Sequence, residues 1–323
     1  MDCAVIVTYR CNAHCQMCHT WRFPSEREEE ITVAEIGKLP EGLGYVNVTG
    51  GEPMLREDIE DIVAVLSSRA KKVELSTNGY LTERIVDLAR RFRELRVRVS
   101  LEGLPRANDE IRGIKDGFDH GLRTIVRLKE LGIKDIGFGM VIQDSNAEDL
   151  MDFYYLTQHL DIEFGQATPH NSFYFHKMDN KIENPDRVTA AVRDLIRAFL
   201  RSARPKLWFR AYLNLGIIAF INNEPRILPC GAGTDLFFLD PYGEVYPCNA
   251  MEETMGNIGQ ATFEQIWNGP RAKQVREMVK NCPHRCWMVG TARPAMMRRP
   301  AGPMLWLMKN KARLLLGKDV VWS

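Results

Sequence analysis

Three cysteines lie within eight residues in the segment Cys11-Asn-Ala-His-Cys15-Gln-Met-Cys18. Thiolates at this spacing can bind three irons of a cubane iron–sulfur cluster and leave the fourth iron without a protein ligand. The simpler alternative is a structural zinc site, which needs a fourth ligand, here His14 or His19. An iron with an open position can bind a second molecule, so the pattern favours a catalytic iron–sulfur site over structural zinc.

Four more cysteines lie far along the chain in two pairs, which are Cys230 with Cys248 and Cys282 with Cys286. Four thiolates can hold zinc or a fully ligated iron–sulfur cluster, and taken alone these four favour zinc. The remaining cysteine, Cys3, lies in an apolar run and is expected to be a small buried side chain.

Short β-rich runs alternate with amphipathic helical patterns from residue 3 to about residue 167, which predicts repeated β-α units and a parallel sheet. The expected strands are 3–8, 45–49, 72–76, 97–101, 136–142 and 162–167, and the expected helices include 58–68, 84–93, 121–131, 147–160 and 185–202. Thr32 and Glu35 form a capping-box pattern that starts another helix. The fold class predicted is α/β, a partial (β/α)6 barrel of the TIM type.

Glycines and polar residues follow these strands at the points where the strands end. Gly50-Gly51-Glu52-Pro53 follows the second strand, Ser76-Thr77-Asn78-Gly79 the third, and Ser100-Leu101-Glu102-Gly103 ends the fourth. Paired glycines let a backbone approach a ligand closely, and Glu52 offers a carboxylate to a cation. Because the carboxyl ends of parallel strands meet at one rim, we expect these residues to lie close together.

The regular alternation of strands and helices is not expected to continue beyond residue 205. Residues 205–210 are expected to lead away from the barrel, residues 236–239 and 245–246 predict a β-hairpin, and residues 270–280 predict a helix that leads to Cys282.

The charge balance and the distribution of apolar residues argue against a nucleic-acid-binding, secreted or membrane-spanning protein. Lys and Arg number 43 against 42 Asp and Glu, so the overall charge gives no electrostatic case for binding nucleic acid. The sequence shows no basic leader with a cleavage site and no apolar stretch of about 18 residues, so neither secretion nor a membrane span is predicted. We therefore expect a cytoplasmic enzyme whose cysteines bind metal rather than form disulfides.

Together these motifs resemble those of the radical S-adenosylmethionine (radical SAM) superfamily. Cys11, Cys15 and Cys18 match its CxxxCxΦC cluster motif, with Met17 in the usually aromatic Φ position. The run 50–53 matches its GGEP motif. Residues 76–79 and 100–113 match further signatures, with a glutamate, Glu102, where the family more often has aspartate.

The resemblance implies that a [4Fe–4S] cluster with one open iron binds S-adenosylmethionine (SAM). Reductive cleavage of SAM would give a 5′-deoxyadenosyl radical that abstracts hydrogen from a substrate C–H bond. The GGEP run would contact the methionine amino group, Glu102 the ribose, and Val141 the adenine. The full set of implied SAM contacts is Met17, Gly50, Gly51, Glu52, Asn78, Ser100, Glu102, Arg112 and Val141.

The last four cysteines resemble the auxiliary-cluster region of the SPASM and twitch subfamilies. A full SPASM region carries seven or more cysteines, so four imply one fully ligated [4Fe–4S] cluster of the twitch type, which would relay electrons. The implied domains are a radical SAM partial barrel over 1–205, a small α+β SPASM/twitch auxiliary-cluster domain over 206–295, and a basic amphipathic tail over 296–323.

The resemblance implies hydrogen abstraction without naming the substrate. Some members of the family with a twitch-type cluster are aminocyclitol dehydrogenases. Likeness to them favours oxidation of a small polyol, sugar or aminocyclitol as the reaction of this protein. His170 or Arg210 would then take a proton from a substrate hydroxyl. The chief alternative is a peptide-modifying maturase, although the few residues before Cys11 leave no room for a peptide-recognition domain. A radical epimerase and a zinc-binding scaffold without catalysis are further alternatives.

The expected partners are a small-molecule substrate, or else a peptide, and a reducing protein such as flavodoxin or ferredoxin. The run Met304-Leu-Trp-Leu-Met308, with Lys309, Lys311 and Arg313, predicts a basic amphipathic helix that could lie on a membrane surface or reach a lipid-linked substrate. Packing of its apolar face on the barrel or on a second subunit is the simpler alternative. The residues do not define the substrate, the C–H bond attacked or the oligomeric state.

Overall fold

The computed structural model describes residues 1–322, and its centre is one sheet of nine strands. Six of them are parallel neighbours in the order β6-β5-β4-β3-β2-β1. Their bounds are β1 (Asp2–Ile6), β2 (Tyr45–Thr49), β3 (Val73–Thr77), β4 (Arg96–Ser100), β5 (Ile136–Val141) and β6 (Glu163–Ala167). The predicted α/β fold with a six-stranded parallel barrel sheet is confirmed.

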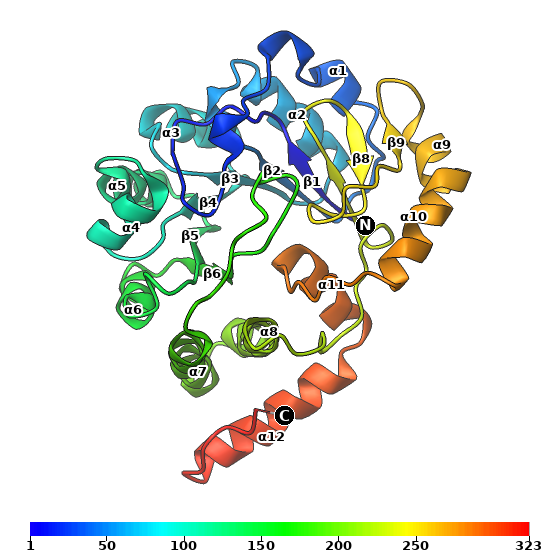
Figure 1. Ribbon diagram of the computed structural model, residues 1–323. Helices are drawn as coiled ribbons and strands as arrows, with labels where there is room; N and C mark the ends of the chain where they lie inside the picture. The colour runs from blue at the N-terminus through cyan, green and yellow to red at the C-terminus, as the bar shows by residue number, and fades with distance from the viewer. Residues whose placement is uncertain (323) are drawn as a thin grey trace.

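Helices cover the outer face of this curved sheet, as Figure 1 shows for α2 to α6. Side chains alternate along β4, where Val97 and Val99 are fully buried and Arg96 and Arg98 lie on the inner face. The covering helices are α2 (Ile59–Arg69), α3 (Thr82–Arg91), α4 (Pro105–Arg112), α5 (Gly117–Glu130), α6 (Leu150–His159) and α7 (Pro185–Arg201).

Short helices lie within the loops that follow β1 and β2. Thr32 and Glu35 form the predicted capping box at the start of α1 (Val33–Ile36). Three 3-10 helices lie nearby, η1 (Thr20–Arg22), η2 (Arg27–Glu29) and η3 (Pro53–Leu55). Helix α4 was not predicted, although proline in its first turn and left-handed Gly113 at its end are recognisable boundary signals.

The strands after residue 230 continue the barrel sheet. β7 (Leu236–Leu239) pairs in parallel with β1, and β8 (Glu244–Tyr246) and β9 (Gly256–Asn257) follow as antiparallel neighbours. The predicted hairpin is therefore confirmed. Within residues 1–322 this region has no sheet of its own, because β1 supplies its inner neighbour.

Helix α8 (Pro205–Ile221) packs along α7, so the expectation that residues 205–210 lead away from the barrel is wrong. The expected domain boundary at residue 205 falls between these two packed helices. The remaining helices are α9 (Phe263–Asn268), α10 (Pro270–Lys280), α11 (Val289–Arg298) and α12 (Ala301–Leu315). No helix among the described residues has the length and apolarity needed to span a bilayer.

Trp287 joins the last cysteine pair to α8. The residue follows Cys286, is buried, and donates its indole N–H to the Leu213 carbonyl at 2.7 Å. Its ring lies so close to Gly216 that a Cβ added there would be 2.1 Å from it. Glycine at this position therefore lets α8 hold Trp287, and with it the end of the cysteine region.

We expect Gly216→Ala to destabilise the protein by about 1–3 kcal/mol, because overpacking forces neighbouring groups to move. The measurement is the free energy of unfolding in urea. Gly302→Ala is the matched control, since a Cβ at that helical glycine meets only the Tyr212 hydroxyl, at 3.9 Å, and alanine favours helix. Equal unfolding energies for Gly216→Ala and the unchanged protein would contradict this role of Gly216.

Candidate functional site

The loop of residues 11–18 follows β1 closely and lies against the end of α4. The His14 N–H donates to the Arg112 carbonyl at 2.9 Å, and the Gln16 N–H donates to the Ile111 carbonyl at 2.8 Å. These bonds attach the cysteine loop to a barrel helix. The positions of its three cysteines therefore depend on α4 as well as on β1.

Gly50 and Gly51 bring the turn after β2 against the start of this loop. A Cβ added to Gly50 would be 2.5 Å from the Thr8 carbonyl oxygen, and one added to Gly51 would be 2.2 Å from the Arg10 carbonyl oxygen. The Gly51 N–H donates to Thr8 and the Glu52 N–H to Arg10, both at 2.8 Å. Both positions thus require glycine for a backbone contact within the protein. From the sequence alone, the two glycines were explained only by close approach of the backbone to a ligand.

Glu52 places a buried carboxylate beside the cysteine loop. Its oxygens accept hydrogen bonds from the Thr77 hydroxyl at 2.7 Å, the Asn78 N–H at 2.7 Å and the Met54 N–H at 3.1 Å. Burial raises the pKa of Glu52, and these donors oppose that rise. A buried carboxylate held in this way is suited to accept a hydrogen bond from an ammonium group.

Asn78 connects the end of β3 to the cysteine loop. Its side-chain nitrogen donates to Asn12 Oδ1 at 2.6 Å, and its Oδ1 accepts from the Tyr80 N–H at 3.0 Å. Sequence reasoning identified Asn78 but missed Asn12. The two asparagines are 66 positions apart, so no local pattern points to the contact.

Glu102 is buried just beyond the end of β4 and uses both carboxylate oxygens within the protein. Oε1 accepts from Arg112 Nη1 at 2.9 Å, and Oε2 accepts from the Val141 N–H at 2.6 Å. Burial raises the pKa of Glu102, and the Arg112 guanidinium opposes the rise. This one carboxylate joins β4, α4 and β5 at the end of the sheet where the cysteine loop lies.

Arg112 has one buried hydrogen-bond donor that is not used. Its Nε has no partner within the described residues. Burial raises the pKa of Cys15 to about 11, and the charge of Arg112 opposes this effect. A buried guanidinium with a free N–H beside thiols fits an anionic ligand, such as a thiolate-ligated cluster or a carboxylate.

Met17, Ser100 and Val141 are half-buried in the cysteine loop and at the last positions of β4 and β5. The structure therefore brings all nine implied SAM contacts to one end of the sheet.

Residues 168–184, here called the bridging segment, connect β6 to α7 and contact both the cysteine loop and the region of the last four cysteines. Asn180 Nδ2 donates to the Met17 carbonyl at 3.1 Å and to the His170 carbonyl at 3.2 Å. The Tyr174 hydroxyl donates to the Gly50 carbonyl at 2.8 Å. At its other side, the Ser172 hydroxyl donates to the Asn249 carbonyl.

His170 lies in the bridging segment between these two groups of contacts. Its Nε2 is 3.1 Å from Asn249 Nδ2, and Asn249 follows Cys248 in sequence. Its ring packs against Phe175 with 5.1 Å between ring centroids. Burial lowers the pKa of His170 to about 4, so its imidazole is neutral at pH 7.

Arg210 lies near the opposite end of the sheet from the cysteine loop. Its Nη2 is 2.7 Å from Glu163 Oε2, and Glu163 is the first residue of β6. The expectation that Arg210 lies at or beyond the carboxyl end of the sixth strand is therefore wrong. The cause is α8, an unpredicted helix whose first turns lie beside the start of β6, where Lys206 and Arg210 both pair with Glu163.

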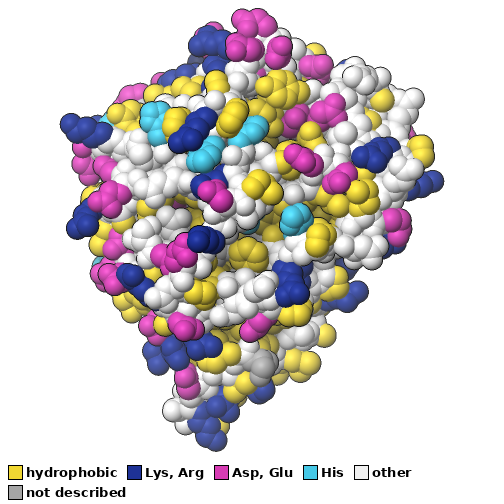
Figure 2. Space-filling view, viewed as in Figure 1, with side chains coloured by type: hydrophobic (Ala, Val, Ile, Leu, Met, Phe, Trp, Pro, Cys, Tyr) yellow, Lys and Arg dark blue, Asp and Glu magenta, His cyan; other side chains and the backbone are white. Residues whose placement is uncertain are grey.

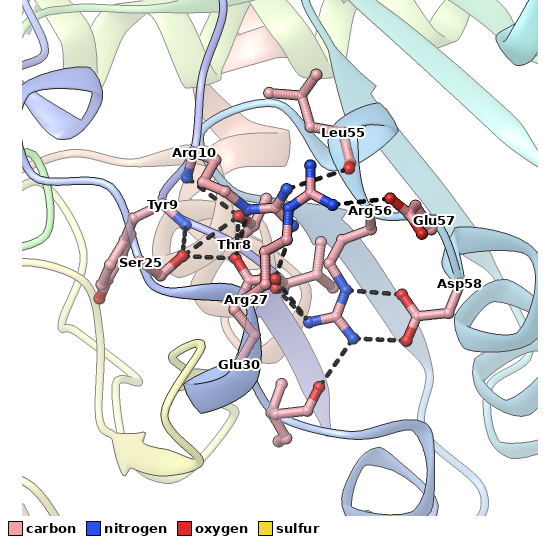
Figure 3. A network of polar contacts seen from close by, with 12 residues as sticks. Thr8, Tyr9, Arg10, Ser25, Arg27, Glu30, Leu55, Arg56, Glu57 and Asp58 are labelled. Carbon is pink, nitrogen blue, oxygen red and sulfur yellow. Dashed lines mark hydrogen bonds and ion pairs between the residues drawn. The ribbon is translucent and has the colours of Figure 1, made fainter.

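A buried ionic network that sequence reasoning missed holds the start of the cysteine loop (Figure 3). The Glu30 side chain is 1% exposed and lies 2.8 Å from Arg10 Nη2 and 3.1 Å from Arg56 Nη1. It also accepts hydrogen bonds from the hydroxyls of Thr8 and Ser25. Because the arginines lie 20 and 26 positions from Glu30, the sequence gives no local signal of this network.

The last four cysteines line one cavity of about 340 Å³. Arg226 borders it, donates to the Cys286 carbonyl, and opposes the effect of burial, which raises the pKa of Cys286 to about 11. Four thiols around a single cavity, with a cation beside them, fit a fully ligated [4Fe–4S] cluster. The four are Cys230, Cys248, Cys282 and Cys286.

All eight cysteines are free of disulfide bonds. Within residues 1–322, no three His, Cys, Asp or Glu side chains converge closely enough to share a single metal ion. A cubane cluster binds each thiolate through a different iron, so its ligands do not need to converge on one point.

Two family models match the sequence. The radical SAM superfamily model matches residues 5–156, and the model of SPASM, an iron–sulfur cluster-binding domain, matches residues 230–288. The first match covers the cysteine loop and strands β2 to β5, and the second contains all of the last four cysteines.

Two curated relatives are similar over most of the chain. The sporulation killing factor maturation protein SkfB of Bacillus subtilis is 26% identical over 296 residues, which cover 87% of this chain and 68% of that protein. Pre-heme d1 synthase of Dinoroseobacter shibae is 25% identical over 295 residues, which cover 82% of this chain and 72% of that protein.

Two solved structures share the fold. Streptococcus suis SuiB bound to S-adenosylmethionine has a TM-score of 0.64 and 17% identity, and the match covers 86% of this chain and 68% of SuiB. The enzyme anSMEcpe with bound AdoMet has a TM-score of 0.64 and 14% identity, and the match covers 96% of this chain and 99% of anSMEcpe.

We expect Glu30→Gln to lower the free energy of unfolding by about 3 kcal/mol, because it removes the anion between the buried Arg56 and the half-buried Arg10. Chemical unfolding at pH 7 is the measurement. Glu57→Gln is the matched control: its ion pair with Arg27 is nearby in Figure 3, but the side chains are 80% and 62% exposed. That change should cost less than about 1 kcal/mol, and equal costs for the two variants would contradict a role for the buried network.

The same network predicts a pH dependence. Burial opposes ionisation of Glu30, but the hydrogen bonds from Arg10, Ser25 and Thr8 outweigh it and lower the pKa of this carboxyl. The stabilisation is therefore present above the unfolded value of about 4.3 and is lost as the pH falls through the folded pKa. Between about pH 5 and pH 3 the unchanged protein should lose more stability than Glu30→Gln, and parallel losses would contradict the assignment.

Proposed function

Because the chain belongs to the radical SAM superfamily and carries a SPASM iron–sulfur cluster-binding domain, we propose that it abstracts hydrogen from a substrate held by its barrel. One observation carries the proposal. The cysteine loop, the Glu52 carboxylate and the Glu102–Arg112 pair meet at one end of the parallel sheet.

Residues of this end would hold the two cofactors. Cys11, Cys15 and Cys18 are the proposed cluster ligands, and Glu52 is the proposed acceptor for the SAM ammonium group. When bound, SAM and its cluster supply a 5′-deoxyadenosyl radical that removes hydrogen from a C–H bond. Hydrogen bonds to the Arg112 and Ile111 carbonyls would fix the position of the cysteine loop. The cluster and SAM would then be held at a constant distance from the substrate.

Arg112 is the proposed anion-binding residue of this site. Glu102 neutralises part of its charge and fixes its orientation, while the unpaired Nε remains available as a donor. A guanidinium beside three thiolates would also stabilise their ionised form, which is the form that binds iron.

The last four cysteines would hold a second [4Fe–4S] cluster. Four thiolates leave no open iron, which supports electron transfer rather than substrate binding as its role. A reducing protein such as flavodoxin or ferredoxin is the proposed electron donor. The bridging segment supports a coupling of the two sites, since it contacts Met17 beside Cys18 and Asn249 beside Cys248.

For the substrate, the inner face of the sheet supports a small polyol, sugar or aminocyclitol. Its charges are paired with one another, as in Arg98 with Glu74 at 3.3 Å. Neutral groups lie beside them, including the Ser76 hydroxyl, which donates to Asn47 at 2.9 Å. A Cβ added to Gly139 would meet no atom within 4 Å, so space is open beside the end of β4. Neutral hydrogen-bonding groups next to free space suit a substrate rich in hydroxyls.

His170 is the proposed proton acceptor for a substrate hydroxyl. Oxidation of an alcohol carbon removes a proton and a second electron after the hydrogen atom has left. A neutral imidazole can accept that proton, and His170 is neutral at pH 7 because burial lowers its pKa to about 4. Arg210 is not part of this proposal, because it pairs with Glu163 at the far end of β6.

A peptide maturase is the second candidate. The observation that favours it is the similarity over 87% of the sequence to a protein named for maturation of the sporulation killing factor. In that case a C–H bond on a peptide residue would occupy the space beside Gly139.

We expect the anaerobically reconstituted protein to bind about eight irons, as two four-iron clusters require, and to form 5′-deoxyadenosine from SAM after reduction. Cys15→Ala should lower the iron to about four and abolish 5′-deoxyadenosine. Cys3→Ala is the matched control, since Cys3 is buried on β1 outside both sites. A colourless protein with stoichiometric zinc would contradict the proposal.

Deuterium transfer distinguishes the two substrate classes. We expect deuterium from a carbon-labelled polyol, sugar or aminocyclitol to appear in 5′-deoxyadenosine, measured by mass spectrometry, because abstraction moves that atom to the cofactor. His170→Gln should slow formation of the oxidised product more than it slows 5′-deoxyadenosine formation. Deuterium transfer from a labelled peptide, and from none of the small molecules, would favour the maturase.

A further inference from the structure

Helix α12 exposes apolar side chains along the face that points away from the protein. Met304, Leu305 and Met308 are 57%, 69% and 67% exposed, and Leu315 and Leu316 are 85% and 71% exposed. Positions three, four and seven apart share one face of a helix, so these side chains form a continuous apolar strip. Surface helices normally present polar residues on this side.

The opposite face of α12 is anchored and holds the helix in this orientation. Trp306 packs against Tyr212 of α8 with 5.7 Å between ring centroids, and its indole N–H donates to the Val321 carbonyl at 3.0 Å. Asn310 is fully buried and exchanges hydrogen bonds with Val321 at 2.8 and 3.2 Å. Lys311 donates to the Leu200 carbonyl at 2.9 Å. The apolar strip therefore cannot turn inward without breaking these contacts.

The sequence around the strip is strongly basic. No Asp or Glu occurs between Glu277 and Asp319, whereas nine Lys and Arg residues do, in a protein with a net charge of only +1. Arg299, Lys309 and Lys318 are exposed, and within residues 1–322 they form no ion pair. Figure 2 shows basic and hydrophobic side chains near one another at the lower end of the molecule, where α12 lies in Figure 1.

We propose that this face of α12 docks on the surface of an anionic phospholipid bilayer. The apolar strip would enter the boundary between headgroups and acyl chains, and Arg299, Lys309 and Lys318 would contact the lipid phosphates. A helix of 15 residues is about 22 Å long, too short to cross the bilayer, which suits an orientation parallel to the surface.

A second copy of this protein is a poorer fit to the same face. In a two-fold dimer the same patch meets itself, so the exposed cations of one copy would lie near those of the other. Residues 278–318 contain no acidic side chain to pair with these cations, and the neighbouring Asp319 already pairs with Arg197 at 2.9 Å. Lipid phosphates supply the missing negative charge. The inference does not depend on the proposed substrate or on either cluster.

Co-sedimentation of the full-length protein with vesicles tests the proposal. We expect binding to vesicles that contain phosphatidylglycerol, at least about tenfold weaker binding to pure phosphatidylcholine, and weakening of the former in high salt. The double variant Leu305→Glu with Met308→Glu should reduce binding to anionic vesicles at least about tenfold, since it places charges in the apolar strip. Both side chains are exposed, so folding should be unaffected.

Tyr155→Glu is the matched control, because Tyr155 is 50% exposed but lies on α6, away from α12. This variant should bind vesicles as the unchanged protein does. Circular dichroism and size-exclusion chromatography of all variants accompany the assay. Equal binding to neutral and anionic vesicles, or no binding at all, would overturn the proposal. So would a dimer that the double variant converts to a monomer, since a second copy would then cover the strip.

Discussion

The site depends on one buried carboxylate whose two oxygens both accept hydrogen bonds from groups in other elements. Glu102 receives a hydrogen bond from the Arg112 guanidinium and another from the Val141 N–H. An ionised group in the interior is costly unless it is paired and hydrogen-bonded, so the ends of β4, α4 and β5 must lie where they do. The Arg112 carbonyl in turn accepts from His14 in the cysteine loop. The geometry around the cysteines therefore depends on the ion pair between Glu102 and Arg112.

Much of the barrel could be predicted from the sequence because its signals are local. Alternating runs such as Arg96-Val-Arg-Val-Ser100 identify strands, and Thr32 with Glu35 identifies a helix start. The cysteine spacing and the Gly50-Gly51 pair likewise depend only on neighbouring residues. All nine implied SAM contacts consequently fall at one end of the sheet.

The features that could not be predicted depend on distant residues. Helix α8 has buried residues on nearly every side, so it shows no polar face from which a helical period could be read. The contacts of Glu30 with Arg10 and Arg56, and of Asn78 with Asn12, join residues that are separate in sequence. The placement of Arg210 was wrong for the same reason, because it follows from α8.

The pairing of β1 with β7 has a consequence for how the protein folds during synthesis. β1 has β2 on one side, about 40 residues away, but its other neighbour begins only at Leu236. At translation rates of about 5–20 residues per second, residue 236 follows β1 by about 10 to 50 s. Through that interval one edge of β1 is without its native partner on the nascent polypeptide. The strand that leads into the cysteine loop is thus among the first to be made and among the last to be enclosed.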